Sequence, residues 1–248
     1  MSNTDHLTAL KDKIQAVEDG SIVAITMPVN IYLQEAEDMA RCARIDIAEL
    51  ATINVTEVQI DDLQARIGAC REVQSLWVED QHKANQAEDL WADIQVQANE
   101  LKSELIHTFR YAYRKDEHLM SAIADIAEGS TNSDTIQDLN DLSVLGKGNT
   151  DALTAINFDL TKLDTAADIA VNGADALAVA NGSRQRGSDT KVLRDKAYTY
   201  LKESVDDIRA AGKFLFRNEP KKLKGYTSKY WKKRNQSVKK ESDVESEI

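Results

Sequence analysis

A basic segment near the C-terminus, residues 221–235, carries the side chains whose types and spacing could do chemistry. Its sequence, KKLKGYTSKYWKKRN, interleaves seven cations with three aromatic residues. Cations attract phosphate groups, and aromatic rings stack on nucleobases or settle into the interface of an anionic membrane. The candidate contacts for such a polyanion, or for docking, are Lys221, Lys222, Lys224, Tyr226, Lys229, Tyr230, Trp231, Lys232, Lys233 and Arg234.

The same segment also suits an intramolecular role. Residues 209–240 hold twelve Lys and Arg against one acid, Glu219, whereas residues 1–208 carry a formal charge of −18. An acidic body attracts a basic tail, which can fold back, bury its aromatic rings and pair its lysines with acids. Folding back is therefore our first interpretation of this segment, and a nucleic acid or an anionic membrane is the alternative partner. The acidic end that follows, residues 241–248, is expected to be disordered.

Two Glu-x-x-His pairs, Glu79/His82 and Glu104/His107, have the spacing of ligands in di-iron helical bundles. In those bundles the two pairs lie on antiparallel helices, but here they are close in sequence with no evident turn between them. We interpret them as surface side chains. The sequence contains no Gly-rich phosphate loop, nucleophile elbow or Cys-x-x-Cys pair. We expect no enzymatic activity, no metal, no cofactor and no small-molecule substrate.

The elements that must position these residues are expected to be helices. The chain of 248 residues has only ten Gly, two Pro and 6% aromatic residues, so it offers few turns. Its apolar residues recur at three- and four-residue steps, as Leu193, Ala197 and Leu201 do. This spacing predicts an all-α fold, an elongated antiparallel helical bundle with long heptad-like seams of the coiled-coil kind.

The turn signals predict two helical hairpins, one on each side of a linker. The first pairs residues 28–54 with 57–80, and the second pairs 150–181 with 190–217. Residues 181–189, NGSRQRGSD, contain two glycines and two arginines that could hold an anion, and we interpret them as the turn of the second hairpin.

The domain organisation follows from these hairpins. Residues 1–217 form a helical bundle whose halves, 1–128 and 150–217, are joined by a polar linker at 129–149. This linker is expected to contain a short helix with Ile136, Leu139, Leu142 and Leu145 on one face, and residues 218–248 form the tail. Within the first half, residues 57–128 contain one proline-free stretch that forms one helix or two. A break is expected either at residues 79–86 or at residues 111–116.

One part of the chain resembles known proteins. Residues 194–230, RDKAYTYLKESVDDIRAAGKFLFRNEPKKLKGYTSKY, together with the upstream DLNDLSVLGKGN and INFDL, resemble a family of uncharacterised bacterial all-helical proteins. The likeness is confined to the C-terminal third. It implies a helical fold and a bacterial source, and because the family has no assigned activity it implies no functional residue.

The remaining features favour a protein that stays in the cytoplasm. The N-terminus is polar and lacks the apolar core of a secretory signal, and the longest apolar run is too short to span a bilayer. Cys42 and Cys70 lie on or beside apolar faces, where reduced core thiols are expected. We therefore expect a non-enzymatic structural or interaction protein that binds a protein partner or its own copy. The alternative is a binder of nucleic acid or an anionic membrane surface through residues 221–235.

Overall fold

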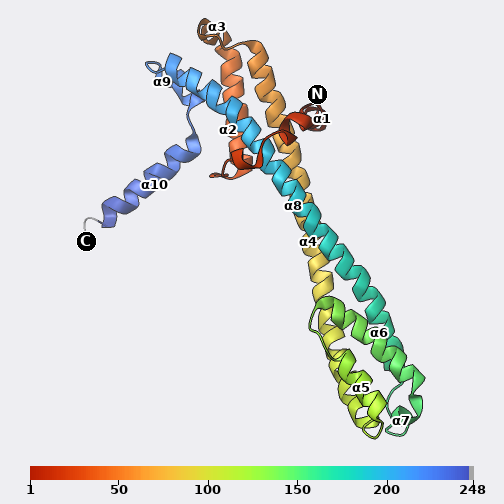
Figure 1. The fold of residues 1–248 in the computed structure, drawn as a ribbon. Coiled ribbons are helices and arrows are strands. Elements are labelled where there is room, and N and C mark those ends of the chain that lie inside the picture. The colour runs from red at the N-terminus through yellow and green to blue at the C-terminus, as the bar shows by residue number, and fades with distance from the viewer. Residues whose placement is uncertain (246–248) are drawn as a thin grey trace. The chain divides into compact units, whose positions relative to one another are not determined.

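The computed structural model describes the backbone of residues 1–245 and the side chains of residues 1–237. These residues form ten α-helices, three short 3-10 helices and no strand, which confirms the all-α class (Figure 1). The helices are α1 Asn3–Gln15, α2 Val29–Ile45, α3 Ile47–Leu50, α4 Glu57–Ala112, α5 Glu117–Ile126, α6 Asn132–Gly148, α7 Thr150–Thr154, α8 Thr161–Leu215, α9 Pro220–Leu223 and α10 Lys229–Glu245. The acidic end, residues 241–248, is predicted to be disordered, but residues 241–245 belong to α10, and residues 246–248 lie outside the described residues.

The chain divides into two compact units whose boundaries fall inside the two longest helices. The first unit contains residues 1–79 and 188–248, and the second contains residues 80–187. This division differs from the predicted halves 1–128 and 150–217, because α4 and α8 each contribute one part to each unit. The first unit therefore combines the two ends of the chain, and each long helix continues from one unit into the other.

The predicted turn at residues 181–189 is wrong, and so is the second hairpin, because α8 runs through this segment without interruption. A glycine inside a helix costs about 1 kcal/mol relative to alanine. Here Ser183 and Gly187, one turn apart, lie on the buried face of α8. A side chain at Gly187 would come within 2.7 Å of the Gln81 amide nitrogen. The small residues thus allow two helices to approach closely rather than turn the chain.

The predicted linker at residues 129–149 contains a 17-residue helix, α6. Its polar start is a capping box, in which the side chains of Thr131 and Asp134 each accept the other's backbone N–H. Its small residue Gly146 lies where a side chain would collide with Phe109 and Leu163. The composition that resembles a linker therefore supplies a helix cap and a close contact.

The long stretch after residue 57 breaks at the second of the two expected places. Helix α4 ends at Ala112, and α5 begins after Asp116. The Asp116 carboxylate accepts the backbone N–H groups of His118 and Leu119, which is an N-cap. Residues 79–86 remain helical.

The core of the first unit is built from α1, α2, the first part of α4 and the last part of α8. It buries large side chains from each of these helices, including Leu33 of α2, Leu63 of α4 and Leu201 of α8. Ion pairs such as Arg71–Glu37, at 2.6 Å, join α4 to α2 at the edge of this core. Both Cys42 and Cys70 are free thiols, Cys70 fully buried and Cys42 half-buried.

The second unit has two smaller clusters. Phe109, Leu139 and Leu163 lie in the larger one, to which α5 and α7 also contribute a buried residue each. The smaller cluster joins α4 to α8 through Ala87, Trp91, Ala176 and Ala180. Three of these four residues are alanines, so this contact buries little side chain.

Candidate functional site

Tyr226 fixes the basic segment to the first unit. Helix α9 begins with Pro220, the position that suits proline, and a 3-10 turn, Lys224–Tyr226, brings the Tyr226 ring into the core. The ring is fully buried and stacks on Phe216, with centroids 5.4 Å apart. Gly212 of α8 makes room for it, since a Cβ there would lie 2.0 Å from the ring.

The hydrogen-bond acceptor of the Tyr226 hydroxyl lies between α2 and α3. It donates a hydrogen bond of 2.9 Å to Oδ2 of Asp46, a buried carboxylate. Burial of the ring, followed by this bond, raises the pKa of Tyr226 above its ordinary value near 10. The bond satisfies two polar groups that would each be costly to bury alone.

The chain just before Tyr226 lies against α2. A side chain at Gly225 would come within 2.7 Å of the Cys42 sulfur, so this glycine permits a close approach of backbone to thiol. Burial raises the pKa of the Cys42 thiol, with Asp46 and Asp38 adding to the effect. The segment therefore covers part of the Cys42 thiol, which is half-buried in the structure.

Two lysines of the segment form ion pairs with acids of the first unit. Lys222 lies 2.5 Å from Glu49, and its ammonium sits 4.9 Å from the centroid of Phe216. Lys229 lies 3.0 Å from Asp38 and, through this hydrogen bond, lowers the pKa of that carboxyl. Both pairs are partly exposed, so each contributes little to stability.

The start of α10 is capped by its neighbours. Glu35 of α2 accepts the backbone N–H of Tyr230 at 2.8 Å, and the Ser228 hydroxyl accepts that of Trp231 at 3.2 Å. A carboxylate at a helix N-terminus is favourable because it meets free N–H groups and the positive end of the helix dipole. Both aromatic rings are half-buried and pack on the core of the first unit.

The other candidate cations face solvent. Lys221, Lys224, Lys232, Lys233 and Arg234 are exposed, and none forms an ion pair with an acid in the part of the chain whose side chains are described. The Arg234 guanidinium lies near the rings of its own helix, 5.4 Å from the centroid of Trp231. The structure therefore separates the ten candidates into a docked group and an exposed group.

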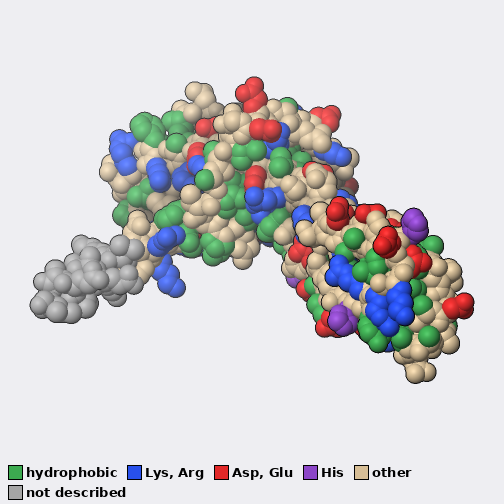
Figure 2. Space-filling model, turned by 60° about the horizontal axis from the view of Figure 1, so that its bottom comes forward, with side chains coloured by type: hydrophobic (Ala, Val, Ile, Leu, Met, Phe, Trp, Pro, Cys, Tyr) green, Lys and Arg blue, Asp and Glu red, His purple; other side chains and the backbone are tan. Residues whose placement is uncertain are grey.

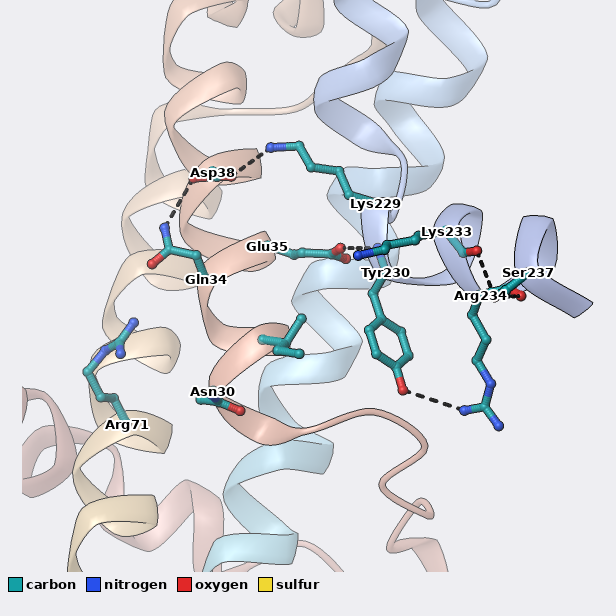
Figure 3. A pocket seen from close by; sticks show the side chains of 11 residues that line it. Asn30, Gln34, Glu35, Asp38, Arg71, Lys229, Tyr230, Lys233, Arg234 and Ser237 are labelled. Carbon is teal, nitrogen blue, oxygen red and sulfur yellow. Dashed lines mark hydrogen bonds and ion pairs between the residues drawn. The ribbon is translucent and has the colours of Figure 1, made fainter.

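A cleft of about 1000 Å³ opens between α2 and α10 (Figure 3). Acidic and amide side chains of α2 form one wall, and basic side chains of α10 form the other, with Tyr230 between them. Its lining residues are Asn30, Ile31, Gln34, Glu35, Asp38, Arg71, Lys229, Tyr230, Lys233, Arg234 and Ser237. On the face of the molecule shown in Figure 2, charges of both signs are interspersed with hydrophobic side chains.

Sequence reasoning missed the partners of the basic segment. Asp46 and Glu35 hold Tyr226 and the start of α10 from positions far away in the sequence, and Gly212 of α8 makes room for the Tyr226 ring. Gly212 alone carried a signal, because a glycine inside a helical pattern often marks a close contact. Nothing in the sequence distinguishes Asp46 and Glu35 from the many other acidic residues of the chain.

The Glu-x-x-His pairs lie along α4. His82 and His107 are exposed, and Glu104 forms an ion pair with Lys162. Among the residues with described side chains, no three His, Cys, Asp or Glu lie together as ligands for a metal ion. Within the same residues, no helix combines the length and the apolar character that crossing a bilayer requires.

Three features of the first unit bear on function: a buried aromatic anchor, a group of exposed cations and a cleft of mixed charge. In comparisons with known proteins, no family model, no curated protein and no solved structure matches this chain.

Proposed function

We propose that this protein is a non-enzymatic helical bundle that works by binding a protein partner. The supporting observation is that the buried charged side chains that the structure describes are all paired within the protein. Of the described side chains, three charged ones are buried, and each is tied to a neighbour: Asp46 to Tyr226, Asp138 to Lys102, and Arg194 to Asp195. None of these three buried charges is therefore available to a substrate, as the acid or base of an active site must be.

Exposed apolar side chains also support a protein-binding role. Leu90, Val171 and Val179 of the second unit have 52–62% of their surface exposed, and so does Phe214 of the first unit, at 61%. Single exposed apolar residues are ordinary on protein surfaces, but helices offer them in a fixed spacing that a partner helix can match. The bundle thus presents apolar positions in addition to its mixed charges.

A photo-crosslinking experiment tests the proposal. A benzoylphenylalanine would be placed singly at Phe214, Val179 or Arg234 and, as a buried control, at Phe216, in cells that produce the protein. Crosslinks to a defined protein, or to a second copy, are expected at one or two of the exposed positions and not at the control. Adducts that are equal at all four positions, or absent from all of them, would contradict a protein-binding role.

A second candidate function is binding of a polyanion. It is supported by Lys232, Lys233 and Arg234, which are exposed and adjacent to the half-buried ring of Trp231. Binding of single-stranded DNA or anionic vesicles would then weaken steeply with salt, because each phosphate contact releases counterions. Anisotropy and vesicle sedimentation at low and moderate salt measure this slope.

A further inference from the structure

We propose that the cleft between α2 and α10 binds an acidic peptide segment of the partner protein. This inference rests on the protein-binding function proposed above and adds to it a surface and a partner chemistry. It depends on three features of the cleft: the balance of its charges, an acceptor without a donor, and an apolar floor.

The charges of the cleft do not cancel. Asp38 accepts hydrogen bonds from both Lys229 and Gln34, and Arg71 is paired with Glu37 outside the lining. Lys233 and Arg234 on the α10 wall have no acidic partner among the described side chains. The cleft therefore keeps two available cations that carboxylates of a partner can neutralise.

Glu35 supplies the second feature. Its Oε1 accepts the backbone N–H of Tyr230, whereas its Oε2 is buried and, within the described residues, has no hydrogen-bond partner. A buried acceptor without a donor carries a desolvation cost that a ligand can relieve. Peptide N–H groups can donate to it, but phosphate oxygens cannot. A peptide can bring both a carboxylate for the exposed cations and an N–H donor for Glu35, which favours a peptide over a phosphate surface.

Ile31 and Tyr230 supply the third feature. Both line the cleft and are half-buried, so they offer apolar area to a side chain of the partner. The α2 wall extends from Asn30 to Asp38, which is about 12 Å at 1.5 Å per helical residue. This length accommodates about two turns of a helix or four extended residues. The fitting ligand has two carboxylates and one apolar side chain within that span.

Selection from a library tests the proposal without knowledge of the partner. Random 12-residue peptides displayed on phage would be selected against the intact protein and, in parallel, against Lys233→Glu/Arg234→Glu. We expect enrichment of sequences with acidic residues around an apolar one on the intact protein alone. The most enriched peptide would then be synthesised with a fluorophore and its Kd measured by anisotropy.

The variants separate the cleft from general charge attraction. Lys233→Glu/Arg234→Glu should weaken the peptide by at least about tenfold. The matched control Lys221→Glu/Lys224→Glu changes the charge equally at exposed positions outside the cleft and should leave the Kd within about twofold. Glu35→Gln keeps an oxygen for the N–H of Tyr230 but replaces an acceptor by a donor, and it should also weaken the peptide several-fold.

Several outcomes would overturn the cleft assignment. They are selection of the same peptides by both proteins, selection of basic peptides, no enrichment at all, and equal weakening by the control pair. Tighter, salt-sensitive binding of single-stranded DNA or anionic vesicles at the same residues would assign them to a polyanion instead. Position-dependent crosslinks at Phe214 or Val179 with a failed selection would reject the cleft and leave the protein-binding function standing.

Discussion

Residues 221–231 and residues 232–237 are neighbours in sequence and both rich in basic residues, yet they have different environments. The first group reaches the core through a fully buried tyrosine and forms ion pairs with acids of the first unit. The second group is exposed, without an acidic partner among the described side chains. A run of basic and aromatic residues therefore does not by itself predict an available binding surface.

The difference lies in what the body of the protein offers to each group. Tyr226 meets an opening that Gly212 leaves and a carboxylate, Asp46, that accepts its hydroxyl. No contact of this kind is available to Lys232 and Lys233, which extend along α10 after its capped start. Aromatic burial fixes the segment, and charge pairs only accompany it.

The largest effect is expected from Tyr226→Ala. Loss of a fully buried ring should lower the free energy of unfolding by about 3–5 kcal/mol, as for other buried aromatic residues. Urea denaturation measures it, and Tyr111→Ala is the control, since Tyr111 is 57% exposed. The same variant should speed the reaction of Cys42 with a thiol reagent, while buried Cys70 stays protected. Unchanged stability and unchanged Cys42 reactivity would show that the segment is not docked in solution.

A smaller effect is expected from Tyr226→Phe. The ring stays, but Asp46 loses the hydroxyl that donates to it and remains buried. An unsatisfied buried acceptor costs about 1–3 kcal/mol. Urea denaturation of Tyr226→Phe at neutral pH checks this value. A variant as stable as the parent would mean that water replaces the hydroxyl at Asp46.

The pH dependence of stability should change in the same variant. The pKa of Tyr226 is raised in the folded state, so its contribution is complete below the unfolded pKa near 10 and is lost as pH rises above it. Between pH 8 and pH 11 the parent protein should lose more stability than Tyr226→Phe. Denaturation curves of both proteins at each pH measure this difference. Parallel pH profiles would contradict the raised pKa.

The smallest effect on stability is expected from the ion pairs. Lys229→Ala removes the contact with Asp38, which is exposed enough that the loss should stay below about 1 kcal/mol and shrink with added salt. Lys232→Ala, with no acidic partner among the described side chains, should have no effect. A loss of several kcal/mol for Lys229→Ala would make charge, rather than the aromatic ring, the main anchor of the segment.

Helix class, many helix faces and one of two expected breaks could be predicted from the sequence. Leu163 and Leu201, for example, belong to periodic apolar faces and are buried. The turn predicted at residues 181–189 is wrong, and the short helix predicted within residues 129–149 is longer than expected. Both segments are rich in small and polar residues, which are equally suited to turns, to helix caps and to close helix contacts. Only the facing helix distinguishes these uses, and it lies far away in sequence.

The sequence by itself determined that this chain is helical, that its charge is divided between an acidic body and a basic segment, and which residues of the segment could bind. These properties depend on local spacing and on composition. Only the tertiary structure decided which cations are paired and which are exposed, because Glu35, Asp38, Asp46 and Glu49 are brought to the segment by helices that precede it by more than 170 residues. Burial and pairing are properties of distant neighbours, and no local pattern encodes them.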